Sequence, residues 1–197
     1  MGSASIYAVL SMELKDEDII QRYLLGDKKS FEVLVKRHFE GVYRFCYRLL
    51  LRQSDAEDVT QETFLKVWKN LPKFKQGAVF KSWLYRIARN GAIDFLRRNK
   101  TSAFSELSDE GDSLVEVIAS EEPLPDEIFF NKENKEFLEK AIEFLPTDYK
   151  IVLSLRYDSE LTFDEIGEVL GKSLNTVKSQ HRRALEVLQK TFFAPER

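Results

Sequence analysis

Apolar side chains recur at steps of three and four residues along this 197-residue chain, and that spacing limits what it can fold into. Such a period places apolar residues on one face of an α-helix, whereas a half-buried strand would alternate. No segment alternates convincingly. Residues 28–52 illustrate the helical pattern, with one predicted apolar stripe made of Phe31, Val35, Phe39, Val42, Phe45 and Leu49. We therefore predict an all-α protein.

Local signals divide the first half of the pattern into elements. The motif SDAE at residues 54–57 is a capping-box pattern, and it predicts a helix that opens there and runs to about Asn70. A proline and a glycine interrupt the period at residues 71–80, which we predict as a loop. Another helix is expected over residues 81–98.

The C-terminal part shows a second series of start and stop signals. Helical pattern resumes near Phe130 and pauses before Pro146, which suits the first turn of a helix. The motif TFDE at residues 162–165 is another capping box, Gly171 is a natural C-terminal cap, and Ser173 can cap a final helix. A short helix, a tight turn and a longer basic helix predict a helix-turn-helix.

The net charge of −3 conceals an uneven distribution. Residues 27–100 carry 17 Lys and Arg against 8 Asp and Glu, whereas residues 101–130 carry 9 Asp and Glu and no Lys or Arg. Residues 131–197 are nearly neutral. A basic body next to an acidic connector is typical of polyanion-binding proteins.

Length and charge together predict two small helical domains, because domains commonly hold about 100–150 residues. We place them at residues 15–100 and 129–197, joined by an acidic flexible linker at 101–128 in which Ser, Asp and Glu dominate and Gly and Pro also occur. Residues 1–14 form an N-terminal extension. Its opening MGSAS resembles a cloning remnant, and Met12 is an alternative start.

Cysteine and histidine are too sparse for a disulfide framework or a zinc site. Cys46 is the single cysteine, His38 is expected near a helix surface, and His181 lies on the final helix. We expect no metal and no other cofactor. The N-terminus lacks a signal peptide and no apolar run is long enough for a membrane span, so we predict a cytoplasmic protein without membrane insertion.

The final helix carries cations and a hydroxyl where a DNA-reading helix would need them. They are Lys178, Ser179, Arg182 and Arg183. A helix in the major groove would place its N-terminal half against base edges and phosphates. The structural alternative is a solvated basic face.

The helix predicted at residues 81–98 carries a mixed aromatic and polar face. Its members are Trp83, Arg86, Asn90, Asp94 and Arg97. The amide of Asn90 has two donors and an acceptor suited to a base edge. Alternatively, Trp83 belongs to the core and the charges pair along the helix.

In the preceding loop, Phe74 lies between Lys73 and Lys75. An aromatic ring flanked by cations can stack on an unpaired base while the cations hold the backbone. The alternative is that Phe74 anchors the loop on the core.

Acidic and amide side chains crowd the start of the helix predicted from residue 54. They are Asp55, Glu57, Asp58, Gln61 and Glu62. The helix dipole accounts for the first three but not for Gln61 and Glu62, which form a patch with Asp58. We predict a protein-docking site there. Without a neighbouring histidine, acid/base or metal chemistry is poorly supported.

Three ordered motifs resemble the group IV, extracytoplasmic-function sigma factors of bacterial RNA polymerase, within the sigma-70 family. They are DAEDVTQETFLKVW, SWLYRIARNGAIDFLRR and LTFDEIGEVLGKSLNTVKSQHRRAL, within a match from about Glu17 to Lys190. The resemblance implies a region 2 helical bundle and a region 4 helix-turn-helix. It also implies a non-enzymatic factor that binds core polymerase, recognises minus-thirty-five and minus-ten promoter elements and promotes DNA melting.

The resemblance further implies a role for each motif. The beta-prime clamp helices of the polymerase would bind Asp55, Asp58, Gln61 and Glu62. The minus-ten element, with one flipped base, would be held by Phe74, Lys75, Arg86, Arg89, Asn90, Arg97 and Arg98. The minus-thirty-five element would be read by Thr176, Lys178, Ser179, Arg182 and Arg183. Other implied partners are the beta flap and an anti-sigma factor.

Two positions depart from the family pattern, and two rival functions remain. Gln180 stands where many relatives have Arg, and His181 replaces a usually apolar residue. An autonomous helix-turn-helix regulator would bind a palindromic operator without polymerase. A helical hydrolase using the carboxylates between Asp55 and Glu62 would show metal-dependent turnover that is lost in Asp58→Ala.

Overall fold

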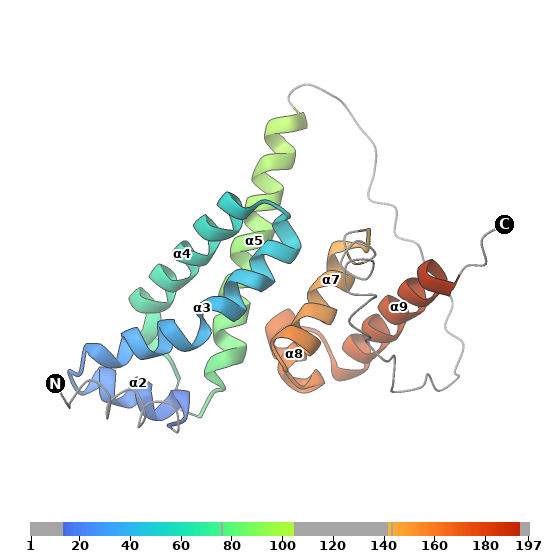
Figure 1. The fold of residues 1–197 in the computed structure, drawn as a ribbon. Coiled ribbons are helices and arrows are strands. Elements are labelled where there is room, and N and C mark those ends of the chain that lie inside the picture. The colour runs from blue at the N-terminus through green and yellow to red at the C-terminus, as the bar shows by residue number, and fades with distance from the viewer. Residues whose placement is uncertain (1–13, 76, 105–141, 143, 194–197) are drawn as a thin grey trace.

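The computed structural model describes residues 14–75, 77–104, 142 and 144–193, and Figure 1 shows their arrangement. The N-terminal group comprises α2 (Asp16–Leu24), α3 (Lys29–Leu50), α4 (Gln53–Asn70), a 3-10 turn η1 (Leu71–Lys73) and α5 (Phe80–Phe104). The C-terminal group comprises α7 (Thr147–Leu153), a π-helical turn η3 (Ser154–Asp158), α8 (Phe163–Leu170) and α9 (Leu174–Phe193). Every element in this described part is helical, which confirms the all-α prediction.

Helix α3 packs against α2, α4 and α5 and supplies much of the core of the N-terminal group. Only the second half of its predicted apolar stripe, from Val42 to Leu49, is buried. In the first half, Phe31 and Val35 are half-buried and pack against the core, and Phe39 is 39 % exposed, and all three line a groove beside α4.

Helix α2 is held on α3 by a charged cluster. The Asp16 carboxylate lies 2.6 Å from Arg37 Nη1 and 2.7 Å from His38 Nε2. His38 is therefore only 8 % exposed, and its expected place near a helix surface was wrong because α2 covers it.

The start of α4 differs from the predicted capping box. The helix begins at Gln53, one residue before Ser54, so Ser54 lies inside the first turn and its hydroxyl donates to Asp55 at 3.2 Å. No side chain caps this end. The predicted end at Asn70 is confirmed.

Helix α5 is longer at both ends than expected. The loop predicted at residues 71–80 contains the η1 turn, and α5 begins at Phe80 and continues to Phe104, beyond the expected end at Arg98. Residues 101–104, which open the predicted linker, thus continue α5, and the linker bounds stay a prediction. The rest of the predicted linker and the helical start near Phe130 lie outside the described residues.

Local signals in the C-terminal group are confirmed. Thr162 and Glu165 form a reciprocal capping box at α8, Gly171 ends this helix at a φ of 64°, and Ser173 accepts the Thr176 amide at 3.2 Å. Pro146 lies at the N-cap of α7 instead of in its first turn. Helices α8 and α9 form the predicted helix-turn-helix, with α7 packed on α9.

The two groups touch along one side of α3 and α5. Helix α5 contacts α8, and α3 contacts both α7 and η3. Buried side chains from both groups belong to a single apolar cluster, which joins Phe45 and Tyr85 to Ile151, Leu155 and Ile166. The described residues therefore form a closed arrangement, which the sequence did not predict.

Candidate nucleic-acid and protein interfaces

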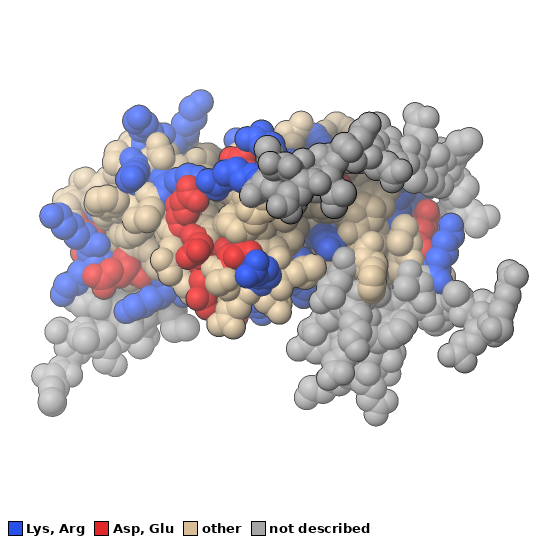
Figure 2. Space-filling view, turned by 90° about the horizontal axis from the view of Figure 1, so that it is seen from above, with Lys and Arg blue, Asp and Glu red and all other residues tan. Residues whose placement is uncertain are grey.

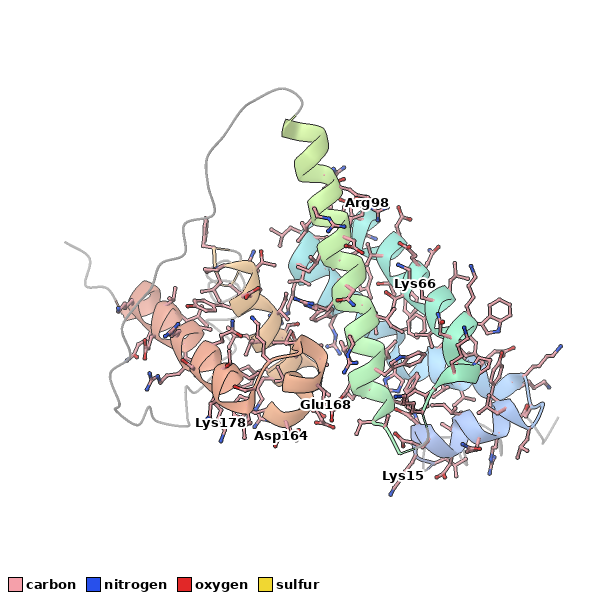
Figure 3. The ribbon with its side chains drawn as sticks, turned by 180° about the vertical axis from the view of Figure 1, so that it is seen from behind. Lys15, Lys66, Arg98, Asp164, Glu168 and Lys178 are labelled. Atoms are coloured by element: carbon pink, nitrogen blue, oxygen red, sulfur yellow. The ribbon has the colours of Figure 1, made fainter. Side chains whose placement is uncertain are left out.

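Helix α9 turns its apolar side to the core and its polar N-terminal turns outward. Val177, Ala184 and Leu188 are buried, whereas Thr176 and Lys178 are exposed. Figure 3 places Lys178 near the start of α9, away from α5. This orientation leaves the first turns of α9 available for a DNA groove.

The remaining residues predicted to read the minus-thirty-five element are less accessible. Ser179, Arg182 and Arg183 are half-buried. The guanidinium of Arg182 also lies 3.6 Å from Glu186, one turn later on α9. The structure thus divides the predicted set into an exposed pair and a partly covered trio.

His181 links α9 to the segments before it. Its Nε2 lies 3.0 Å from the Tyr157 hydroxyl in the π-helical turn, and its ring packs edge-on against Phe163 at 5.0 Å. Arg156 covers the same Phe163 ring at 4.9 Å. His181 therefore takes a structural position between α9 and the segments before it.

The polar face predicted on α5 is present, with its charges paired along the helix. Asn90, Arg97 and Arg98 are exposed. Arg97 lies 3.2 Å from Asp94, and Arg89 donates to the Asn90 side-chain oxygen at 3.2 Å. With that oxygen accepting, the amide nitrogen of Asn90 presents its donors to a ligand.

Arg86 differs from the other predicted minus-ten residues because its partner belongs to the C-terminal group. Its Nη2 donates to the backbone oxygen of Glu168 at 2.6 Å. Figure 3 shows Glu168 on the side of α8 that faces α5. The closed arrangement thus occupies one cation of the predicted DNA-binding face.

Phe74 packs as a loop anchor in this state. Its ring centroid lies 5.2 Å from that of Trp83 and 5.9 Å from that of Phe80, and the side chain is half-buried. Lys73 and Lys75 on either side are exposed. In the closed arrangement Phe74 therefore anchors its loop and Trp83 packs beside it, as the structural alternatives proposed. Base stacking by Phe74 stays a prediction.

The acidic surface of α4, which we define as Asp55, Asp58, Gln61 and Glu62, follows one side of the helix. Asp58 and Gln61 are exposed, while Glu62 accepts from Lys66 at 2.9 Å. That hydrogen bond, opposed by partial burial, holds the pKa of Glu62 below its usual value. Figure 2 shows Asp and Glu side chains gathered on one face among Lys and Arg.

Sequence reasoning missed an apolar groove between α3 and α4. Its lining consists of Phe31, Val35, Phe39, Gln61, Phe64, Leu65 and Trp68. Leu65 and Trp68 are 55 % and 50 % exposed. With the rest of the lining they form an exposed apolar patch, and such patches mark sites where another molecule binds. Gln61 belongs to both surfaces, so the groove continues the acidic surface. The steps from Gln61 to Leu65 and Trp68 were the available sequence signal.

Two features of other protein classes are absent from the described part of the chain. No group of three or more His, Cys, Asp or Glu side chains is placed to hold a metal ion there. No helix among those residues combines the length and apolar character needed to cross a membrane.

Family comparisons match the two ends of the chain separately. The model for sigma-70 region 2 matches residues 34–101, and the model for sigma-70 region 4 matches residues 141–190. The first match contains α4 and most of α5, and the second contains the helix-turn-helix. Together they cover both candidate DNA-binding surfaces and the acidic surface.

Whole-chain comparisons agree with this division. The ECF RNA polymerase sigma factor SigW of Bacillus subtilis is 32 % identical over 182 residues, which cover 91 % of this chain and 97 % of that relative. The ECF RNA polymerase sigma-E factor of Escherichia coli K12 is 30 % identical over 187 residues, which cover 91 % and 95 %.

Solved structures share the fold. One is CnrH in complex with the cytosolic domain of CnrY, with a TM-score of 0.67, 21 % identity and coverage of 92 % of this chain and 99 % of that one. Another is the sigma factor RpoE of Bartonella quintana in complex with the anti-sigma factor NepR, with a TM-score of 0.65, 22 % identity and coverage of 85 % and 99 %. On the strength of both region matches and the relatives that span its length, the chain belongs to the ECF sigma factors of RNA polymerase.

Proposed function

We propose that this chain directs core RNA polymerase to promoters with two elements and helps to open the DNA. The observation that carries this function is the separation of three surfaces on one chain: the acidic surface and apolar groove on α4, the polar face of α5, and the outward turns of α9. A protein that joins an enzyme to two DNA elements requires such separate surfaces. The chain makes the polymerase specific and takes no catalytic role.

The α4 surface is proposed to bind the beta-prime clamp helices. Exposed Leu65 and Trp68 provide apolar area for a partner helix, and Asp58 and Glu62 provide charge beside it. Apolar residues at the centre of an interface contribute most of its affinity, whereas charges at the rim favour the correct partner and orientation.

The α5 face is proposed to hold the opened minus-ten element. DNA melting disrupts stacking worth about 1.4 kcal/mol per base-pair step, and capture of one flipped base offsets part of that cost. The Asn90 amide would bind the base edge, Phe74 and Lys75 would hold the flipped nucleotide, and Arg89, Arg97 and Arg98 would hold phosphates.

The first turns of α9 are proposed to bind the minus-thirty-five element in the major groove. Exposed Thr176 and Lys178 would make the first contacts. Ser179, Arg182 and Arg183 would follow after small side-chain movements. We also propose that the C-terminal group contacts the beta flap, which would set its distance from the N-terminal group on the promoter.

An anti-sigma factor is a further proposed partner. CnrH and the Bartonella RpoE, which share this fold, were solved with CnrY and with the anti-sigma factor NepR respectively. We retain residues 15–100 and 129–197 as the proposed limits of the two functional domains. The autonomous regulator is not favoured, because the curated relatives that span the chain are sigma factors.

Run-off transcription with bacterial core polymerase on a pool of genomic promoters tests this function. The protein should produce discrete new starts. Asn90→Ala should lower their yield about 10-fold or more, whereas Asn99→Ala, the same change at an exposed site on α5, should have little effect.

Core binding is tested separately by competition with a labelled sigma factor. Trp68→Ala and Asp58→Ala should weaken binding, whereas Asp18→Ala on α2 should not. Specific binding of a palindromic duplex by the protein alone, together with no stimulation of any bacterial core, would favour the autonomous regulator instead.

A further inference from the structure

We infer that the contact between the N-terminal and C-terminal groups is an autoinhibitory latch, in which Arg48 and Asp158 hold the free protein closed and Arg86 is withheld from DNA. This inference rests on the proposed function, because it concerns the regulation of the same promoter-binding surfaces. It assigns a role to Arg48 and Asp158, which lie outside the predicted polymerase and DNA contacts.

The apolar part of the contact gives the closed state its stability. Tyr85 on α5 is 2 % exposed, and its ring packs edge-on against Phe45 of α3 at 5.5 Å. The same buried cluster includes Ile151 and Leu155 from the C-terminal group. Separation of the groups exposes this apolar surface to water, which opposes opening.

The polar part is a two-point ion pair between the groups. Arg48 Nη2 donates to Asp158 Oδ1 at 2.9 Å, and Arg48 Nε lies 2.8 Å from Asp158 Oδ2. Ser154 also donates to Asp158 Oδ2 at 2.7 Å. Both charged side chains are largely covered, at 31 % and 15 % exposure, and bidentate pairs of this kind favour one orientation.

The π-helical turn places Asp158 for this contact. Residues 154–158 form the turn directly after α7, so Asp158 ends it opposite α3. The same turn carries Tyr157, whose hydroxyl contacts His181 on α9. Short π-helical turns often mark functional sites, and here the turn connects the latch to the DNA-reading helix.

A third contact between the groups involves Arg86, which is one of the residues predicted to bind DNA. Glu168 lies in the last turn of α8, where backbone oxygens lack helical partners and the helix dipole is negative. The Arg86 guanidinium binds one of these oxygens at 2.6 Å. This contact takes one of the five donors of the exposed guanidinium and directs the side chain toward the C-terminal group, so it competes with binding of Arg86 to a phosphate of the minus-ten element.

Distance makes the closed state unsuitable for a two-element promoter. Elements centred about 25 base pairs apart are separated by about 85 Å along the DNA at 3.4 Å per base pair. A compact chain of this length has a radius of gyration of about 16 Å, hence a diameter of about 40 Å. The groups must therefore separate before both elements are bound. Residues 105–141, if fully extended at about 3.3 Å each, are long enough to bridge the gap.

Energy transfer between dyes on the two groups tests the latch in the full-length protein. Lys69→Cys on α4 and Gln189→Cys on α9 provide exposed attachment sites, and buried Cys46 is left in place. Arg48→Ala is the main latch variant. Each latch variant is also titrated with core polymerase on a promoter found by run-off transcription. Arg44→Ala is the matched control of Arg48→Ala, because Arg44 lies one turn earlier and pairs with Glu40 on the same helix at 3.8 Å.

Arg48→Ala should increase the low-transfer population and lower the half-saturating concentration for transcription by about 3- to 10-fold, because a larger open fraction raises apparent affinity. Arg44→Ala should match the wild type in both measurements. Arg48→Asp should also open the protein, and adding Asp158→Arg should restore part of the high-transfer population. If Arg48→Ala unfolds, Asp158→Asn provides the test and keeps the acceptor for Ser154.

Unchanged transfer and an unchanged half-saturating concentration in a folded latch variant, with normal transcription, would overturn the latch and leave the sigma function intact. Increased opening without a change in that concentration would overturn its inhibitory role. If the wild type itself directs no transcription, the proposed function fails and the inhibitory role fails with it.

Discussion

Asp16 illustrates how a single residue couples the position of α2 to pH. Burial alone would raise its pKa, but the hydrogen bonds and charges of His38 and Arg37 outweigh burial and hold the pKa below its usual value of 3.8. The folded protein therefore favours the carboxylate more than the unfolded chain does. This stabilisation is present above the unfolded pKa and is lost as the pH falls through the lowered folded pKa.

Asp16→Asn should accordingly reduce the free energy of unfolding at neutral pH by about 1–2 kcal/mol, because a charge-assisted hydrogen-bond cluster is lost. The difference from the wild type should shrink as the pH falls below about 4. Urea unfolding across this range measures both effects, with exposed Asp18→Asn as the control on the same helix. A difference that persisted undiminished at about pH 2 would assign the effect to something other than the carboxylate charge.

At the scale of elements, the crossing of α3 and α5 depends on a glycine. A β-carbon added at Gly41 would lie 2.7 Å from the Tyr85 hydroxyl, and Tyr85 is buried, so its ring has little room to move. Gly41 thus allows the two helices to approach closely, despite the low helix propensity of glycine.

The effect of Gly41→Ala on the free energy of unfolding should depend on whether Tyr or Phe occupies position 85. In the wild type the substitution should destabilise the protein by about 1–3 kcal/mol through overpacking. In a Tyr85→Phe background, where the hydroxyl is removed, the same change should become neutral or stabilising by up to about 1 kcal/mol, because alanine favours the helix. A double-mutant cycle of unfolding free energies measures this coupling. Additive effects would contradict the predicted contact.

The capping box of α8 is a second element-scale feature, since it fixes the helix that supports α9. Thr162→Ala removes the acceptor of the Glu165 amide, a contact of 3.3 Å, and should destabilise α8 by about 1 kcal/mol. Hydrogen exchange of the α8 amides should then quicken about fivefold, whereas Thr162→Ser should remain close to the wild type. Equal exchange in all three proteins would show that the cap does not support the helix.

At the scale of the whole molecule, positive charge is concentrated in the N-terminal part of the chain that is proposed to bind the minus-ten DNA. Residues 27–100 are strongly basic, although the chain as a whole is acidic. Lys and Arg that bind phosphates release counterions from DNA, so promoter affinity should fall steeply with salt. Net charge alone would have concealed this property.

Salt dependence separates phosphate contacts from base contacts in the polymerase complex. Arg98→Ala should reduce the slope of log affinity against log salt by about 0.7–0.9, the effect of one lost phosphate contact. Asn90→Ala should weaken binding with little change in slope, because it is proposed to bind a base. Filter binding at several salt concentrations provides the measurement. The reverse pattern would exchange the two proposed roles.

The sequence by itself determined the helical class, the order of the motifs and the caps at Thr162, Gly171 and Ser173. These features depend on interactions within a few residues, so a local pattern contains the necessary information. The start of α4 was misplaced because several polar residues there are compatible with a cap, and only the helix path selects among them.

Only the tertiary structure decided what lies next to what. The apolar groove needs α3 and α4 side by side, and Arg86 meets Glu168 only because α5 and α8 are packed together. Arg48 and Asp158 are 110 positions apart in the chain. Their pairing results from the burial of one apolar cluster by both groups, a cooperative outcome of many distant contacts that no local spacing specifies.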